Sequence, residues 1–153
     1  MRYIILRGGE FISGFYYNLS ESKRGLERYI ASQQKRYPAD MLRETLRIVA
    51  QPDYELPSAL LGVLRDEIYR RIERDTVGAI YSKPLLESHI RTRIFGLNGH
   101  YYEVTPIARV QALTALLSSN AIKESGGILT RTSEKIELHA SIPGLRSYST
   151  QRA

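Results

Sequence analysis

The apolar positions of the chain switch between helical and strand spacing, and the clearest helical stretch lies at residues 57–75. There Leu60, Leu64, Ile68 and Ile72 recur every four positions, and Pro57 suits the first turn of a helix. Charged residues of both signs fill the other faces, which is typical of a solvated helix surface. By the same spacing the sequence predicts further helices at residues 20–34, 38–50, 83–94 and 106–119.

Turn residues between β-prone runs predict hairpins. Asn98-Gly99 joins residues 94–97 to residues 100–104, and Asn-Gly is the strongest short hairpin signal. Gly8-Gly9 similarly divides the first 17 residues into two strands. Strict alternation near the C-terminus, over residues 136–142, predicts a last hairpin within residues 128–142. The short segment 76–81 fits a strand or a helix equally well.

This pattern predicts an α+β fold, a mainly helical single domain with two or three short β-hairpins. A chain of 153 residues is the usual size of one domain. We expect residues 1–142 to form that compact domain, and the polar residues 143–153 to form a flexible tail.

Composition excludes several classes of chemistry. The absence of cysteine excludes disulfides, thiolate metal sites and thiol catalysis. The longest apolar run near the N-terminus, Tyr3–Leu6, is too short for a signal peptide or a membrane span. We therefore expect no membrane association and a cytoplasmic location, or a place in an intracellular assembly or virion.

The charge balance points to a polyanionic partner. The formal net charge is +6, and residues 1–50 carry nine Lys/Arg against five Asp/Glu. A basic excess of this kind favours nucleic acid, although many basic proteins bind nothing charged.

The stretch "SKPLLESHIRTRIFGLNGHYYEVTP" predicts a helix, a tight hairpin and the start of another helix. With the helix before it, residues 57–119 resemble the winged helix-turn-helix DNA-binding domains of microbial regulators. In that family one helix enters the major groove, and a hairpin wing lies beside it against the backbone. The resemblance implies a winged-helix-like fold, and a transcriptional regulator that binds duplex DNA as a homodimer or higher homo-oligomer.

Carried onto this sequence, the resemblance makes Ser82–Ile94 the recognition helix, Phe95–Val104 the wing and Pro106–Ser119 a packing or dimer helix. Glu87 interrupts the basic face of the first of these. The expected nucleic-acid-binding residues are Lys83, Ser88, Arg91, Thr92, Arg93, His100 and Tyr101. A second basic patch is expected at Lys35, Arg36, Arg43 and Arg47.

A second helix and hairpin, residues 106–119 and 128–142, follow the same order as recognition helix and wing. Arg109 is the only formal charge on that helix, so we expect it to serve packing. The paired tyrosines Tyr16-Tyr17 and Tyr101-Tyr102 also suggest base stacking in RNA, although no RNA-binding signature accompanies them.

No motif indicates an enzyme. The three histidines, His89, His100 and His139, lack metal-ligand spacing, and no phosphate-binding glycine loop or nucleophile motif occurs. We expect no catalytic residue, no metal and no cofactor.

The alternative function is a structural assembly protein, such as a viral coat or nucleoid-type subunit, or a helical subunit of a larger complex. Such a protein contacts the nucleic-acid backbone without reading sequence. The segments "QPDYELPSALLGVLRDEIYRRIE", "RTRIF" and "TPIARVQALTALL" are also similar in layout to the helical domain of GINS replication subunits. The C-terminal β-domain of that family is too long for the residues that remain here.

Overall fold

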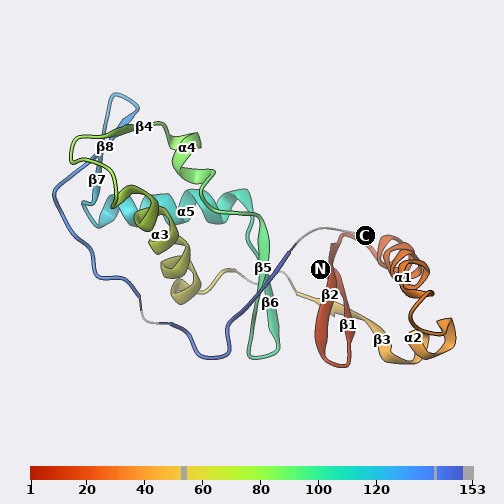
Figure 1. The fold of residues 1–153 in the computed structure, drawn as a ribbon. Coiled ribbons are helices and arrows are strands. Elements are labelled where there is room, and N and C mark those ends of the chain that lie inside the picture. The colour runs from red at the N-terminus through yellow and green to blue at the C-terminus, as the bar shows by residue number, and fades with distance from the viewer. Residues whose placement is uncertain (53–54, 140, 150–153) are drawn as a thin grey trace. The chain divides into compact units, whose positions relative to one another are not determined.

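The computed structural model describes residues 1–52, 55–139 and 141–149. The chain divides into two compact units, and Figure 1 shows the course of the chain through its helices and strands. Unit 1 comprises Met1–Glu55, Arg93–Glu103 and Leu145–Ala153, and unit 2 comprises Leu56–Thr92 and Val104–Gly144. Among the described residues there are five helices and three three-stranded antiparallel sheets. The fold thus mixes helices and sheets, and the prediction of a mainly helical domain was wrong.

The first sheet of unit 1 has the order β2-β1-β3, with β1 at Arg2–Arg7, β2 at Glu10–Tyr16 and β3 at Leu46–Gln51. The predicted Gly8-Gly9 hairpin is confirmed, because Arg7 pairs with Glu10 and both glycines have positive φ. The predicted helix at 38–50 ends early: α2 covers Ala39–Thr45 and the chain then pairs with β1. Ile48 and Val49 are β-branched, and the open edge of β1 supplies backbone partners that a helix would not use.

Helix α1 covers Leu19–Gln33 and packs with α2 on the first sheet. Asn18 caps it, and the Asn18 side-chain oxygen accepts from the backbone N–H of Glu21 at 2.8 Å. The core between these elements comprises the buried residues Ile5, Tyr16, Ile30, Leu42 and Leu46.

The second sheet of unit 1 has the order β6-β5-β9, with β5 at Arg93–Leu97, β6 at His100–Glu103 and β9 at Arg146–Ser149. The Asn98-Gly99 hairpin is confirmed by the pairing of Leu97 with His100. Strand β9 lies where the sequence predicted a flexible tail. Its Tyr148 ring lies 5.0 Å from the ring of Phe11, between centroids, and this aromatic contact helps to hold the C-terminal segment in unit 1.

Unit 2 begins with α3, Ser58–Ile72, and ends its helical part with α5, Pro106–Ser118. The two helices lie side by side (Figure 1), and both predicted helices are confirmed. A small sheet of order β4-β8-β7 completes the unit, with β4 at Ile80–Tyr81, β7 at Ile122–Ser125 and β8 at Ile128–Arg131.

Two sequence-based predictions fail in unit 2. The helix expected at 83–94 is the short α4, Lys83–Glu87, and β5 of unit 1 begins at Arg93. The last hairpin is β7–β8, not 128–142, and residues 132–139 form neither helix nor strand. Residue 140 of that predicted hairpin lies outside the described residues. The alternating stretch is held by side chains of α3 instead of by a strand partner.

Candidate nucleic-acid interface

The residues assigned to a recognition helix occupy α4 and the turn after it. Lys83 forms an ion pair with Glu124 of β7, with Nζ and Oε1 2.8 Å apart. The Ser88 hydroxyl donates to the carbonyl of Leu85 at 2.6 Å, which ends the helix. Arg91 and Thr92 are exposed beyond it, and the Thr92 hydroxyl accepts from the guanidinium of Arg109. A five-residue helix of this kind does not offer the continuous face that was predicted.

The remaining predicted residues belong to unit 1. Arg93 lies on β5 with its guanidinium over the Phe95 ring, 4.6 Å from the centroid, and His100 begins β6. Tyr101 is buried at 8% exposure, and its hydroxyl donates to the carbonyl of Gly9 at 3.3 Å. Burial raises the pKa of Tyr101 above its usual range. Tyr101 is therefore a core residue, and the predicted set is divided between the two units.

The second predicted patch lies wholly in unit 1, on the chain between α1 and β3. Lys35 and Arg36 follow α1 directly, and Arg47 is exposed on β3. Arg43 forms two parallel hydrogen bonds to Glu27, at 2.6 and 2.8 Å. The hydrogen bond between them lowers the pKa of Glu27 and raises that of Arg43. Three of the four cations thus remain candidates for a backbone contact.

Helix α5 presents the longest regular exposed face in unit 2. Thr105 caps it by accepting from the backbone N–H of Ala108 at 3.2 Å, and Pro106 takes the first turn. Its inner face is built from small and branched side chains, Ala108, Ala112, Leu113 and Leu116. The exposed residues at helical spacing are Ile107, Val110, Gln111, Thr114 and Ser118.

That exposed face combines apolar side chains with an amide. Ile107 is 70% exposed and Val110 is 50% exposed, although both are β-branched apolar residues. Gln111 adds an exposed amide, and the Thr114 hydroxyl donates to the carbonyl of Val110 at 2.9 Å, which leaves its methyl group outward.

A hairpin follows α5 almost directly. Asn120 ends the helix with φ of 64°, a left-handed conformation that asparagine tolerates. The Thr132 backbone N–H donates to Ala121 and its hydroxyl donates to Asn120, which holds the base of the hairpin to the helix end. Lys123 is exposed on β7, and Gly126-Gly127 forms the turn at the tip. Helix and hairpin thus form one local structure.

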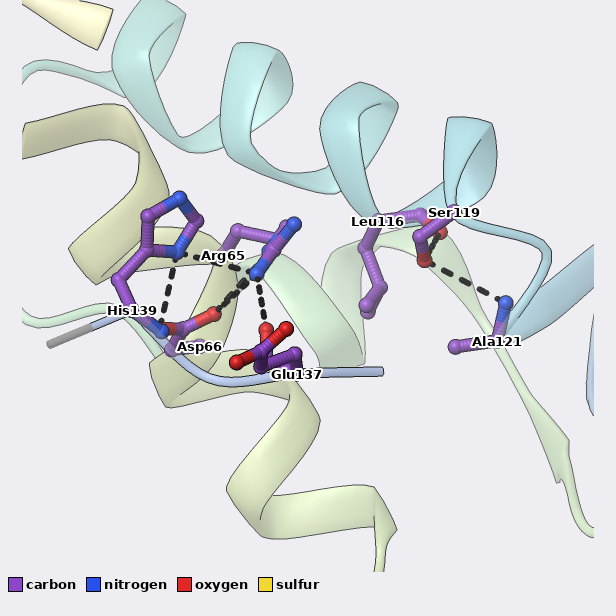
Figure 2. A network of polar contacts seen from close by, with 7 residues as sticks. All are labelled: Arg65, Asp66, Leu116, Ser119, Ala121, Glu137 and His139. Atoms are coloured by element: carbon purple, nitrogen blue, oxygen red, sulfur yellow. Dashed lines mark hydrogen bonds and ion pairs between the residues drawn. The ribbon is translucent and has the colours of Figure 1, made fainter. Parts of the chain in front are cut away.

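Asp66 of α3 binds the irregular segment 132–139 through hydrogen bonds (Figure 2). Asp66 is 4% exposed and accepts from the guanidinium of Arg65 at 2.8 and 3.0 Å. It also accepts from the backbone N–H of His139 at 2.6 Å, and the His139 imidazole Nδ1 lies 3.1 Å away. Arg65 in turn donates to the carbonyl of Glu137 at 3.0 Å. This network was not predicted, because residues 66 and 139 are too distant in sequence for any local pattern to pair them.

His89 lies beyond the end of α4. Burial lowers its pKa below the ordinary value, and the nearby Arg71 lowers it further while Asp75 opposes the change. Within residues 1–52, 55–139 and 141–149, no three His, Asp or Glu side chains come together as a metal site would require. In the same part of the chain, no helix is both long and apolar enough to cross a membrane.

No protein-family model matches the sequence, and comparison with curated proteins and with solved structures finds no match. The candidate site therefore depends on the geometry of α5 and β7–β8 alone. Sequence reasoning noted that this helix and a later hairpin follow in order, but it placed the hairpin too late and discounted the helix for its lack of charge. The exposure of Ile107, Val110 and Gln111 is the feature that the sequence did not reveal.

Proposed function

We propose that the protein binds double-stranded DNA through unit 2, with α5 in the major groove and the β7–β8 hairpin beside it. The observation that carries this proposal is the exposed face of α5, where an amide and apolar groups lie at helical spacing. An α-helix fits the major groove, and base edges there are read by hydrogen bonds and by apolar contacts, which neutral side chains can make as well as charged ones. The scarcity of formal charge on α5 is thus compatible with base reading.

The chemistry of the face also suggests which bases it reads. A glutamine amide pairs with the N6 and N7 atoms of adenine, and apolar side chains contact the methyl group of thymine. Gln111 supplies the amide, and Val110 and Ile107 supply the apolar contacts. We therefore expect A·T base pairs to be preferred, and the role to be that of a small DNA-binding regulator.

The cations that hold the backbone lie off the reading face. Lys123 is exposed on β7, and its place on the hairpin suits a contact with a phosphate. The helix-then-hairpin order is that of winged helix-turn-helix domains, although here the chain between α4 and α5 passes through β5 and β6 of unit 1. A compact turn usually joins the two helices of this motif, whereas here the connection between α4 and α5 contains two strands.

Fluorescence anisotropy with an A·T-rich and a G·C-rich duplex tests the proposal. Gln111→Ala is expected to reduce the preference for A·T by roughly 5- to 100-fold, since a bidentate base contact is worth about 1–3 kcal/mol of discrimination. Gln34→Ala, an exposed glutamine of unit 1, is the matched control and is expected to change nothing. Equal binding of the two duplexes by the unaltered protein would show that α5 does not read bases.

The assembly function remains a second candidate, because Ile107 and Val110 also suit a helix–helix contact between subunits. Light scattering separates the two candidates. A large oligomer that dissociates in Ile107→Asp, without any base preference, favours assembly. A dimer that prefers one duplex favours the regulator.

A further inference from the structure

A pocket of about 200 Å³ opens in unit 1, lined by Tyr16, Glu21, Arg24 and Arg28. Arg24 and Arg28 are four positions apart on α1, so both guanidinium groups rise from the same face of the helix. Glu21 lies one turn before Arg24, and Tyr16 ends β2 beneath them. None of these residues belongs to the interface proposed for unit 2.

The floor of the pocket is fixed. Tyr16 is 2% exposed, and its hydroxyl shares a 2.5 Å hydrogen bond with the hydroxyl of Ser13, which is also buried. The Tyr16 ring reaches this position only because residue 25 of α1 is glycine. A Cβ at Gly25 would lie 2.3 Å from the Tyr16 oxygen. Glycine lowers helix stability by about 1 kcal/mol relative to alanine, but at position 25 it leaves the space that the Tyr16 side chain occupies.

The charged residues that line the pocket favour an anionic ligand. The residues that line the pocket include two arginines and one glutamate, so their formal charges sum to one positive charge. Like charges four residues apart on a helix repel each other, and a bound anion would offset that repulsion. The planar guanidinium fork matches the oxygens of a phosphoryl group, where two parallel N–H donors can bind at once.

The volume of the pocket limits the size of the ligand that it can hold. The pocket is smaller than the roughly 300–1,000 Å³ that drug-sized ligands occupy. It has room for a single phosphoryl group with part of what it is attached to. Unit 1 also carries most of the basic excess of the chain, including Lys35, Arg36 and Arg47 outside the pocket.

We propose that this pocket binds a phosphoryl group of a nucleic-acid backbone between Arg24 and Arg28. The proposal is independent of base reading by α5, since it uses different residues in a different unit. It adds a second place at which the protein can hold a phosphate.

Titration of the ¹⁵N-labelled full chain with inorganic phosphate, and separately with a single-stranded tetranucleotide, tests this site. The amide signals of residues 16–28 are expected to shift and saturate with both ligands. Arg24→Gln and Arg28→Gln are each expected to weaken binding at least fivefold, while Lys23→Gln, on the same helix outside the pocket, leaves it unchanged. These surface changes do not touch the core, and far-UV circular dichroism verifies the fold of each variant.

The two ligands distinguish the sources of the phosphoryl group. Tighter binding of the tetranucleotide than of inorganic phosphate, lost in the two arginine variants, supports a backbone ligand. Equal binding of both assigns the pocket to free phosphate and overturns the nucleic-acid part of the proposal. Unchanged affinity in both arginine variants, or no shifts in residues 16–28, overturns the site altogether. The failure of Gln111→Ala to alter duplex binding would leave this result unaffected.

Discussion

The backbone N–H of His139 donates to the buried carboxylate of Asp66 at 2.6 Å, across 73 positions of sequence. This bond and its neighbours hold an irregular segment against α3, and the described residues of that segment, 132–139, form neither helix nor strand. The anchoring residue is a charge inside the unit, and its acceptor sites are filled by Arg65 and His139.

Removal of the Asp66 carboxylate is therefore expected to release the segment. Asp66→Ala should lower the free energy of unfolding by about 2–3 kcal/mol, because buried donors lose their acceptor. The amide of His139 should also exchange with solvent much faster, which hydrogen exchange followed by NMR measures directly. Glu73→Ala, an exposed carboxylate at the end of α3, is the control. Equal losses in the two variants would show that the network contributes no stability.

Two helical glycines offer a paired test of packing. Gly25→Ala places a Cβ 2.3 Å from the oxygen of the buried Tyr16, and we expect a loss of about 1–3 kcal/mol from overpacking. Gly62→Ala places a Cβ 2.6 Å from the imidazole of His139, which is 43% exposed and able to turn away. The second change should cost less than the first in urea denaturation.

The sign of the Gly62 effect is expected to reverse once the imidazole is gone. In a His139→Ala background, Gly62→Ala should stabilise unit 2 by about 1 kcal/mol, the ordinary preference of a helix for alanine. A double-mutant cycle measures this change. A Gly62→Ala cost that stays the same with and without the imidazole would mean that His139 does not occupy this position in solution.

Acidification is expected to weaken unit 2 through His89. Its pKa in the folded protein lies below the ordinary value of about 6.5, so between the two values the unfolded chain binds more protons than the folded one. The contribution of neutral His89 to the free energy of unfolding is fully present above about pH 6.5. It is lost as the pH falls toward the pKa of His89 in the folded protein. Urea denaturation at several values between pH 7.5 and pH 5, followed by amide signals of unit 2, should show a shallower decline in His89→Gln. Identical slopes would contradict the assignment.

Local signals in the sequence were sufficient for elements whose start or turn is chemically marked. The Gly8-Gly9 and Asn98-Gly99 turns and the Thr105-Pro106 helix start are all where the pattern predicted them. The sequence did not predict β3, because residues 46–51 form a strand only when β1 offers an open edge. It missed β9 for a similar reason, since its pairing with β5 joins residues 50 or more positions apart.

The candidate site was predictable only in outline. Net charge and element order suggested nucleic acid, but the charged residues chosen for groove reading are divided between two units, and Tyr101 is buried. The sequence analysis chose the charged segment 82–94 as the recognition helix, whereas the exposed face of α5 is nearly neutral. Exposure of an apolar residue depends on the whole packing arrangement, so Ile107 and Val110 could be recognised only in the structure.

Backbone contacts by the hairpin make a separate prediction about salt. Lys123→Ala should reduce the slope of log affinity against log salt concentration by about one. It should also lower the affinity for A·T-rich and G·C-rich duplexes by the same factor. Lys135→Ala, another exposed lysine of unit 2, is the comparison. A change in base preference in Lys123→Ala, rather than in slope, would place Lys123 on the reading face instead.

The measurement that tests the central claim most directly is duplex binding by three proteins under one salt concentration: the unaltered chain, Gln111→Ala and Lys83→Ala. We predict that the unaltered chain prefers the A·T-rich duplex, that Gln111→Ala loses this preference, and that Lys83→Ala keeps it because Lys83 is paired with Glu124. Loss of the preference in Lys83→Ala but not in Gln111→Ala would contradict the account and return the reading role to the residues around α4.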